Sequence, residues 1–376
     1  MIQETSKYLR SLGVIRPTVI LDKPQILRNI KKMAQKARIS GVKFRPHFKT
    51  HQSHTIGDWF RECGARAISV SSLDMAQYFT DRGWRDITIA LLANILEIDK
   101  INVLSSTIRL NLIVDSMAMV QALHAGLKYP VKIWLKIDVG YERTGATWDD
   151  TQTIVSIAKA VLHYPKMHFV GLLAHSGQSY RARSTEQVRQ VYNQTVKRMR
   201  FVRKILHGYG VKKCKISVGD TPTCSVIENL SAVDEIRPGN FVFNDLMQEQ
   251  IGSCQPNEIA IGVACPVIGK YAQRQQIVII GGAVHLSKEY IVDRQGKRLF
   301  GYITDLEGDS LGSIYKTTPV RTLSQEHGCI QIDDRDLFDQ IEVGNLILIS
   351  PVHSCLTCNL FTKYKTLQGE IISRLY

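Results

Sequence analysis

Long apolar runs, concentrated charge and disulfide-type cysteine spacing are all missing from this 376-residue sequence. No apolar run approaches the ~20 residues that a membrane helix needs, and the first segment, MIQETSKYLRSLG, lacks the apolar core of a signal peptide. The eight cysteines are spread along the chain, unlike the dense pattern of a disulfide scaffold. We therefore expect a soluble, cytoplasmic protein with reduced thiols and no membrane partner.

Basic residues outnumber acidic ones, but they are not clustered. The chain has 48 Lys and Arg against 34 Asp and Glu, a formal net charge of +14. Such an excess could attract nucleic acid, a membrane or an anionic cofactor. A nucleic-acid-binding surface requires a basic patch or stripe, whereas the basic residues here form no run longer than a pair. We expect no nucleic-acid partner, and an anionic cofactor remains open.

Hydrophobic patterning predicts two domains, because the chain is too long for one average core. Eight β-rich runs, most of them separated by enough chain for a helix, predict an α/β protein with a (β/α)8 TIM-like barrel. The runs cover residues 43–49, 67–71, 86–92, 110–115, 131–139, 168–175, 214–219 and 235–243. Short alternating runs after residue 252 predict a second, β-rich domain. The predicted division is an N-terminal segment 1–17 that packs on the β-domain, a barrel 18–252 and a β-domain 253–376.

The first run carries an unusual number of charges for a buried strand. In KFRPHFKTHQ, residues 43–52, strand alternation places Arg45, His47, Lys49 and His51 on one face. Barrel enzymes hold their chemistry at the C-terminal ends of the strands, so these side chains would line the barrel mouth. An exposed edge strand is the alternative interpretation.

Polar motifs also follow the later runs. DVGYERTG contains Arg143, AHSGQSY contains His175 and Tyr180, and GDTPT and EIRPGNFVF accompany the last two strands. Together with RPHFKTH, these motifs resemble those of the alanine racemase-like, fold-type III pyridoxal phosphate enzymes. The later PVHSC resembles the metal-activated branch that contains D-serine dehydratase and D-threonine aldolase. The resemblance spans nearly the whole chain and implies pyridoxal 5'-phosphate at the barrel mouth.

The resemblance also implies roles for individual residues. Lys49 would bind the cofactor covalently, and a partly desolvated, cationic neighbourhood would lower the pKa of its amine. Arg237 would face the pyridine nitrogen, His175 would lie beneath the ring, and Arg143 and Tyr180 would line the pocket. The implied catalytic residues are Lys49 and His175, and the implied cofactor-binding residues are Lys49, Arg143, His175, Tyr180, Gly219, Thr221, Arg237, Gly239 and Asn240.

Two glycine turns are the candidates for binding the cofactor phosphate. Backbone N–H groups at residues 219–221 and 239–240 would offer donors at the ends of the last two barrel strands, where TIM barrels commonly bind phosphate. The alternative is that these glycines merely form turns. Asp220 lies between the proposed donors, and its carboxylate would repel a phosphate unless the side chain points away.

The segment LISPVHSCLTC contains the candidate metal ligands. On an extended chain His353 and Cys355, two residues apart, project to the same side, and imidazole with thiolate suits zinc. We expect zinc or another divalent metal here. Cys355 and Cys358 also form a C-x-x-C, so a redox pair or half of a structural zinc site is an alternative, as is a pair of unrelated core residues.

These expectations combine into a lyase that acts on a β-hydroxy D-amino acid. Dehydration to a 2-oxo acid and ammonia is the main hypothesis, because by resemblance the cysteine ligand is more typical of the dehydratases. Retro-aldol cleavage to glycine and an aldehyde, amino acid racemisation and a pyridoxal phosphate carrier without turnover are the alternatives. The resemblance further implies a homodimer in which one subunit's β-domain completes the barrel mouth of the other.

Overall fold

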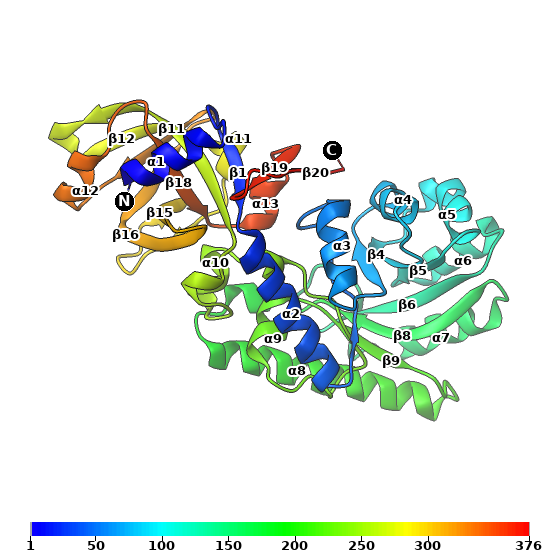
Figure 1. Ribbon diagram of the computed structural model, residues 1–376. Helices are drawn as coiled ribbons and strands as arrows, with labels where there is room; N and C mark the ends of the chain where they lie inside the picture. The colour runs from blue at the N-terminus through cyan, green and yellow to red at the C-terminus, as the bar shows by residue number, and fades with distance from the viewer. Residues whose placement is uncertain (1, 376) are drawn as a thin grey trace. The chain divides into compact units, whose positions relative to one another are not determined.

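The computed structural model describes residues 2–375, and its contacts divide the chain into two compact units (Figure 1). We call Lys31–Gly239 the barrel unit, and Met1–Ile30 with Asn240–Tyr376 the β unit. This division by contacts differs from the bounds at residues 18 and 252, which followed the order of strand patterns along the chain. Those predicted bounds stay a prediction.

Eight parallel strands form the barrel unit, in the order β2-β10-β9-β8-β6-β5-β4-β3. A bridge between His47 and Ser69 joins the two ends of this path and closes the barrel. The strands are β2 (Lys43–Phe44), β3 (Ile68–Val70), β4 (Asp86–Leu92), β5 (Arg109–Val114), β6 (Val131–Asp138), β8 (Met167–Ala174), β9 (Lys215–Val218) and β10 (Glu235–Ile236), with the short β7 (Ala146–Thr147) beside β6. Each of the eight predicted runs overlaps one of these strands, so the predicted TIM-like barrel is confirmed.

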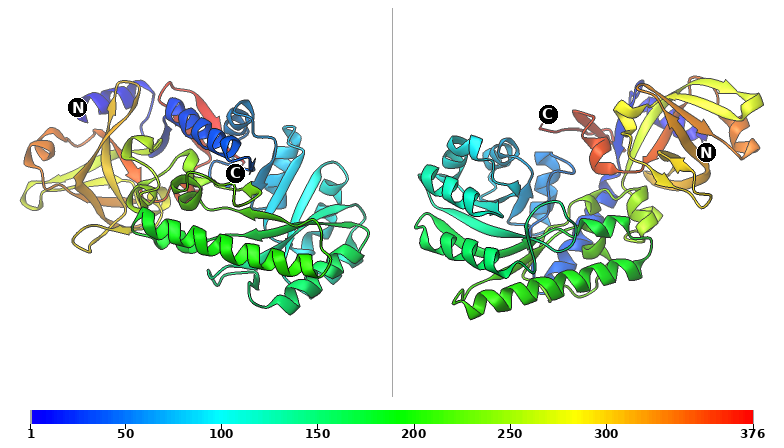
Figure 2. Two further views of the ribbon diagram at one scale, coloured as in Figure 1. Left: turned by 90° about the horizontal axis from the view of Figure 1, so that it is seen from below. Right: turned by 180° about the vertical axis from the view of Figure 1, so that it is seen from behind.

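Helices follow the barrel strands and lie outside them, as the long α8 beside β8 and β9 shows (Figure 2). Ser72, Ser116 and Ser184 each cap a helix by accepting a hydrogen bond from the backbone N–H three residues later. The helical segments are α2 (Lys23–Ile39), which runs from the β unit into the barrel unit, α3 (His54–Glu62), α4 (Leu73–Asp81), η1 (Ile95–Glu97), α5 (Ile98–Ser105), α6 (Met117–Gly126), α7 (Thr151–His163), η2 (Gly177–Arg181), α8 (Thr185–Gly208) and α9 (Thr221–Val226).

The first and last barrel strands are shorter than the sequence pattern predicts. Parallel hydrogen bonds continue past β2, from Arg45 N to Ile236 O (3.0 Å) and from His47 N to Pro238 O (2.9 Å). Beyond His47 the chain turns, so strand alternation ends there. His51 is consequently not on the face of His47: it is buried against Phe48 and Phe60, with ring centroids 4.5 and 5.6 Å away.

The charge of Arg45 lies inside the barrel and not at its mouth. Its side chain is only 2% exposed and forms 2.8 Å ion pairs with Glu235 of β10 and Asp86 of β4. Burial opposes the charge, but the two carboxylates raise the pKa of Arg45 above its usual value. The prediction that Arg45 lines the barrel mouth is therefore wrong, and the buried charge is explained by its two partners.

The β unit is built on a closed antiparallel barrel, because β12 pairs with β11 as well as with β17. Its strand order is β12-β17-β16-β15-β18-β11-β1-β19-β20. The strands are β1 (Thr18–Leu21), β11 (Ile261–Tyr271), β12 (Gln276–Ile280), β15 (Gly301–Glu307), β16 (Ser310–Leu323), β17 (His327–Gln331), β18 (Leu346–Pro351), β19 (Lys363–Thr366) and β20 (Ile371–Ser373), with a hairpin of β13 (Ile291–Val292) and β14 (Arg298–Leu299). The predicted β-rich second domain is confirmed.

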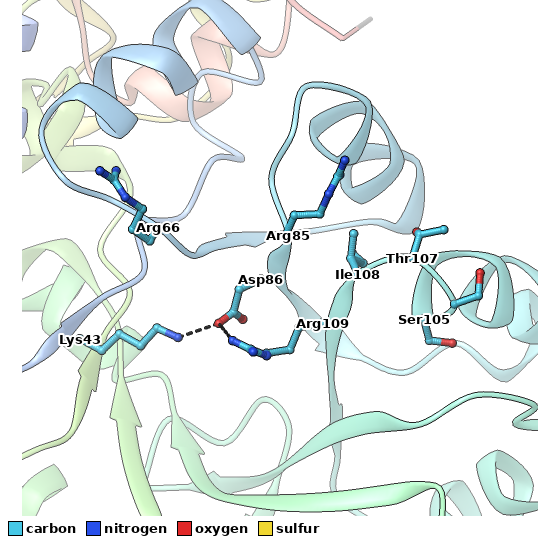
Figure 3. Close-up of a pocket in the computed structure, with 9 residues that line it drawn as sticks. Lys43, Arg66, Arg85, Asp86, Ser105, Thr107, Ile108 and Arg109 are labelled. Carbon is cyan, nitrogen blue, oxygen red and sulfur yellow. Dashed lines mark hydrogen bonds and ion pairs between the residues drawn. The ribbon is translucent and has the colours of Figure 1, made fainter.

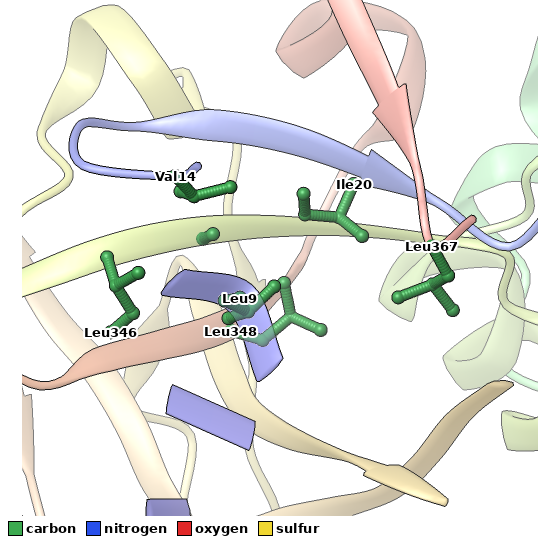
Figure 4. Close-up of a cluster of buried hydrophobic side chains, with 7 residues drawn as sticks. Leu9, Val14, Ile20, Leu346, Leu348 and Leu367 are labelled. Carbon is green, nitrogen blue, oxygen red and sulfur yellow. The ribbon is translucent and has the colours of Figure 1, made fainter. Parts of the chain in front are cut away.

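Short helices surround this sheet, and the N-terminal helix packs on it. The helical segments are α1 (Ile2–Ser11), η3 (Asn240–Val242), α10 (Leu246–Ile251), η4 (Pro256–Glu258), η5 (Ala272–Arg274), α11 (Ala283–Leu286), α12 (Arg335–Gln340) and α13 (Ser354–Cys358). Leu9 of α1 joins Ile20 of β1, Leu348 of β18 and Leu367 in one buried cluster (Figure 4). No helix within residues 2–375 combines the length and the apolar character needed to cross a bilayer.

Gly171 permits close contact between two barrel strands. A Cβ at this position would lie 2.0 Å from the Lys215 carbonyl oxygen of β9, a distance that only backbone movement could relieve. We expect Gly171→Ala to lower the free energy of unfolding by about 3 kcal/mol, the upper end of overpacking effects. Denaturant unfolding followed by circular dichroism measures this change. Gly208→Ala is the control, because nothing lies within 4 Å of its Cβ position; an equal loss in both variants would contradict the explanation.

Candidate active site

A cavity of about 330 Å³ lies at the C-terminal ends of the barrel strands. It brings together five of the predicted site residues, namely Lys49, Arg143, His175, Gly219 and Arg237. Its size is in the range of small-molecule pockets, and cationic and imidazole groups line it together with apolar side chains. The barrel mouth is therefore the candidate active site of this chain.

Lys49 enters the cavity from the turn that follows β2. Its backbone N–H donates to Nδ1 of His47 (3.2 Å), and both side chains line the cavity. The Lys49 side chain is exposed, so the barrel unit does not supply the desolvation that we expected around its amine. Burial, and then the charges of Lys49 and Arg237, lower the pKa of His47 well below its usual value. His47 is thus a neutral imidazole beside the lysine.

His175 directly follows β8, and its ring is held in one tautomer. Its Nδ1–H donates to the Gly219 carbonyl oxygen at 2.5 Å, which leaves Nε2 without a proton when the ring is neutral. Burial lowers the pKa of His175 to about 3, so the ring is uncharged at neutral pH. A neutral, fixed aromatic ring in the cavity suits the expected position beneath a flat cofactor.

Arg237 remains cationic although it is buried. Its Nη2 donates to the Ala174 carbonyl oxygen (2.7 Å) and its Nη1 to Ser217 Oγ, so the guanidinium is fixed at the end of β10. Burial lowers its pKa to about 10, which still leaves it charged at neutral pH. A fixed, permanent donor is what the expected partner of a pyridine nitrogen requires.

Arg143 reaches the cavity from a loop that Asp138 organises. The Asp138 carboxylate accepts hydrogen bonds from the backbone N–H groups of Gly140, Tyr141 and Glu142 at 2.8–2.9 Å. Arg143 then extends over the Tyr141 ring, 5.1 Å from its centroid, with an exposed side chain. The DVGYERTG motif is therefore a tight turn that presents one arginine to the pocket.

Lys136 is a cavity residue that the sequence reasoning missed. It is 7% exposed, and burial followed by the charges of Arg237 and Arg143 lowers its pKa to about 7. Such a group changes protonation near neutral pH. Strand alternation contained the signal, because Lys136 lies two residues after the inward-facing Trp134 on β6, but no motif drew attention to it.

The GDTPT turn has the form needed to bind a phosphate. Asp220 caps α9 and points into the protein, where its carboxylate accepts from Thr223 N (2.8 Å), Thr223 Oγ1 (2.8 Å) and Ser179 Oγ (2.9 Å). Burial raises the pKa of Asp220 to about 6. The carboxylate is thus hydrogen-bonded inside the cap, which is the inward orientation that the expected phosphate position requires.

Glycine is required at both predicted phosphate turns. A Cβ on Gly219 would lie 2.7 Å from the Arg237 Cβ, and one on Gly239 would lie 2.8 Å from the His47 carbonyl oxygen. Tyr180 is not part of the cavity lining, but its hydroxyl accepts from Thr221 N at 3.3 Å. The cavity and the adjoining turns therefore fit pyridoxal phosphate, with an exposed amine, a neutral ring, fixed cations and a backbone cradle that side chains would fill.

Asn240, the remaining predicted cofactor residue, has a side chain directed elsewhere. It belongs to the β unit, and its Nδ2 donates to Asp245 Oδ2 (2.7 Å) and Ser354 Oγ (3.0 Å), with Cys355 Sγ at 3.6 Å. Asn240 thus supports the segment that contains the predicted metal ligands.

The predicted metal ligands do not lie on an extended strand. β18 ends at Pro351, His353 is the N-cap of α13 with extended backbone angles, and Cys355 lies in the first helical turn. The expectation that both ligands project from one strand is wrong, and Cys355 and Cys358 share a helix face at i and i+3. The two cysteines differ in burial, because Cys355 is half-buried whereas Cys358 is 1% exposed. Burial raises the pKa of the Cys358 thiol well above the usual value. Cys358 thus belongs to the buried core of the β unit.

Asp245 is a second residue that the sequence reasoning missed. This buried N-cap of α10 accepts hydrogen bonds from Asn240 Nδ2 and from the Ser354 backbone N–H (2.8 Å), and its Oδ2 lies 3.5 Å from His353 Nδ1. Burial opposes ionisation, but His353 and the hydrogen bonds lower the pKa of Asp245. The carboxylate places a negative charge on the Nδ1 side of the His353 ring, at a separation longer than a usual hydrogen bond. A carboxylate in this position is the kind of group that can orient a metal-binding imidazole. No group of three metal-binding side chains occurs in the described part of the chain, so His353 and Cys355 remain a two-ligand candidate.

Comparison with known proteins identifies similar chains along the full length. Residues 21–246 match the alanine racemase N-terminal domain, and residues 260–367 match the putative serine dehydratase domain. The chain is 30% identical over 369 residues to D-threo-3-hydroxyaspartate dehydratase of Delftia sp. (strain HT23), with 94% of each chain covered. It is 29% identical over 382 residues to D-serine dehydratase of Dictyostelium discoideum, covering 94% of this chain and 93% of that one.

Solved structures show the same fold. The Delftia dehydratase superposes with a TM-score of 0.89 at 29% identity, covering 97% of this chain and 98% of that one, and one cysteine-to-alanine variant of it was solved in a metal-free form. A D-threonine aldolase of Arthrobacter sp. is a partial relative, 27% identical over 239 residues and 61% of each chain.

The position of Asp245 predicts its effect on metal affinity. Asp245→Asn keeps an N-cap oxygen for α10 but removes the charge that orients His353, so we expect a 10- to 100-fold loss of zinc affinity, measured by chelator competition. Asp334→Asn is the matched control, because Asp334 caps α12 of the same unit in the same way. Unchanged zinc affinity in Asp245→Asn, or an equal loss in Asp334→Asn, would exclude this role.

Proposed function

Since the chain belongs to the alanine racemase N-terminal domain family and continues into a serine dehydratase domain, we propose that it dehydrates a β-hydroxy D-amino acid to a 2-oxo acid and ammonia. Enzymes of this kind are pyridoxal phosphate-dependent lyases on D-amino acids. The observation that carries the proposal is the cavity that gathers Lys49, His175, Arg143 and Arg237 at the barrel mouth.

Different residues of the site would bind different parts of the cofactor. Lys49 would bind pyridoxal phosphate covalently through Nζ, Arg237 would donate to its ring nitrogen, and the backbone N–H groups of residues 219–221 would hold its phosphate. His175 would provide a neutral wall for the ring. When bound, the cofactor supplies an electron sink for negative charge at the substrate Cα.

Proton transfer is assigned to Lys49. When the substrate amine replaces Lys49 on the cofactor, the freed Lys49 amine would take the Cα proton, and the β-hydroxyl would leave as water with a proton returned from the pocket. The remaining enamine tautomerises, and its hydrolysis gives the 2-oxo acid and ammonia. His47 and His175 are neutral imidazoles, so the fixed positive charge of the cavity comes from Arg237. Lys136, with a pKa of about 7, is the neighbouring group best suited to exchange protons with the pocket at neutral pH.

Departure of the hydroxyl is assigned to a metal held by His353 and Cys355. Imidazole and thiolate favour zinc, and two protein ligands leave positions open for water and substrate. The metal would polarise the leaving hydroxyl as a Lewis acid. The metal-free cysteine-to-alanine variant of the Delftia dehydratase supports a metal in a related enzyme. Asp245 supports His353 in this scheme, and Asn240 contacts Cys355.

Retro-aldol cleavage is the second candidate, because a D-threonine aldolase is among the relatives. Both reactions need a β-hydroxyl and a metal, but they break different bonds: dehydration breaks Cβ–O, whereas the aldolase breaks Cα–Cβ. The products therefore distinguish them.

Product analysis tests the proposed reaction. With D-serine, D-threonine or 3-hydroxy-D-aspartate, we expect ammonia and a 2-oxo acid but no aldehyde. Lys49→Ala should lose this activity and also the visible, borohydride-fixable absorbance of the bound cofactor. Glycine with an aldehyde would identify an aldolase, interconversion of D- and L-isomers a racemase, and cofactor binding without turnover a carrier protein. Retention of the fixable absorbance in Lys49→Ala would assign the covalent bond to another lysine.

Metal removal tests the second half of the proposal. Chelation should abolish turnover and leave the cofactor absorbance intact, because Lys49 and the glycine turns hold the cofactor. His353→Ala and Cys355→Ala should reproduce the chelated state, measured as zinc per folded protein. Cys358→Ala should keep its zinc, since the Cys358 side chain is buried. If Cys358→Ala lost zinc as fully as Cys355→Ala, the site would be a structural C-x-x-C centre.

A homodimer completes the proposal. A β unit in one subunit would cover the barrel mouth of the other and desolvate the exposed Lys49. Light scattering at micromolar concentration should give twice the mass of the 42.5 kDa chain, and a monomer would contradict this arrangement.

A further inference from the structure

Cationic side chains recur at the N-terminal ends of neighbouring barrel strands, opposite the active-site mouth. Arg66 lies two residues before β3, Arg85 lies one residue before β4, and Arg109 is the first residue of β5. Lys43 begins β2 in the same way. Because the strands are parallel, with Asp86 paired to Arg109, these starting points lie on one rim of the barrel.

A hollow of about 580 Å³ lies on this rim (Figure 3). Lys43, Arg66, Arg85 and Arg109 line it, with Asp86 and the segment 105–108 that follows α5. It shares no lining residue with the active-site cavity. The barrel unit therefore has a second, strongly basic hollow that the proposed reaction does not use.

Helix capping uses only some of the hydrogen-bond donors of Arg66 and Arg85. Arg66 Nη1 donates to the carbonyl oxygen of Arg61 (2.8 Å) in the last turn of α3, and Arg85 Nη1 donates to that of Thr80 (2.7 Å) in the last turn of α4. Within residues 2–375, no hydrogen bond engages Nε or Nη2 of Arg66 or Arg85, and both side chains are exposed. Guanidinium donors thus remain for a ligand.

The one carboxylate in the hollow is already compensated. Asp86 Oδ1 accepts from Arg45 (2.8 Å) and Asn111 (3.0 Å), and its Oδ2 accepts from Lys43 (2.8 Å) and lies 3.5 Å from Arg109. Figure 3 shows Lys43 and Arg109 meeting at Asp86, while Arg66 and Arg85 point away from it. The four cationic side chains that line the hollow outnumber this one carboxylate, so the rim keeps a positive excess.

The pKa of the neighbouring Lys132, on β6, is lowered in this environment. Burial, and then the charge of Arg109, lower its pKa. The hydroxyls of Ser105, Ser106 and Thr107 donate to carbonyl oxygens of α5 and are not spare donors. Recognition in the hollow therefore depends on the guanidinium groups.

We propose that this hollow binds a small, multiply charged phosphoryl anion through Arg66, Arg85 and Arg109. Guanidinium groups match phosphoryl oxygens with paired donors, and a condensed phosphate carries several negative charges in a volume that such a hollow accepts. The proposed site is separate from the proposed lyase reaction, since the hollow shares no lining residue with the active-site cavity.

Calorimetric titration of the pyridoxal phosphate-saturated protein with inorganic tripolyphosphate tests the proposal. Saturation blocks the phosphate turn of the active site. We expect saturable binding to the full-length chain that weakens with added salt. The triple variant Arg66→Gln, Arg85→Gln, Arg109→Gln should lose at least tenfold in affinity, with its fold checked by circular dichroism. The control is Lys197→Gln, Arg200→Gln, Lys204→Gln on α8, which removes the same charge from exposed positions outside the hollow and should change affinity less than twofold.

Each other result contradicts the proposal. Absence of saturable binding at low salt would show that the hollow does not bind the anion. Equal weakening in both triple variants would show that the affinity depends only on the net charge of the protein. Affinity that keeps rising from pyrophosphate through long-chain polyphosphate would identify an extended polyanion surface. If the triple arginine variant is unstable, Arg85→Gln alone with Arg200→Gln as its partner control gives the same comparison, with an expected loss of at least threefold.

Discussion

The buried guanidinium of Arg45 is the interaction on which closure of the barrel depends. Only two residues of β2 form regular strand, and Pro46 interrupts its ladder of N–H donors. Arg45 compensates by bonding Glu235 of β10 on one side of β2 and, on the other side, Asp86 of β4. Removing one partner of a buried ion pair costs about 3–5 kcal/mol, because the other charge is left uncompensated. Lys49 lies four residues after Arg45, so its position at the mouth depends on this interaction.

The barrel itself could be predicted from the sequence, because buried parallel strands are short apolar runs separated by helices. Where polar residues replace this pattern, prediction by alternation fails. The run 43–49 contains a strand only at Lys43–Phe44, because a turn follows the bridge at His47. Similarly, HSC at 353–355 was predicted as extended, but the chain leaves β18 at Pro351 and starts a helix at Ser354. A five-residue helix is too short to produce a periodic signal.

The candidate site was predictable where residues belong to motifs and was missed where they act through tertiary contacts. Lys49, His175 and Arg237 are in recognisable motifs, and they line one cavity. Asp245 resembles an ordinary helix cap in the sequence, and its relation to His353, 108 positions later, exists only in the folded β unit. Lys136 could not be identified from the sequence for the same reason, because its pKa is lowered by burial and by arginines on other segments.

Strand β1 has a consequence for how the protein is made. It lies between β11 and β19, pairing antiparallel with the former and parallel with the latter. During synthesis β1 therefore waits for β19, because the whole barrel sequence is made between these two strands. During translation the barrel can form from contiguous chain, but the β unit can be completed only after the barrel sequence has been made. A nascent chain released early would expose the apolar edge of β1 and the α1 side chains that normally pack in the cluster around Leu348, and these are the surfaces that chaperones would need to protect.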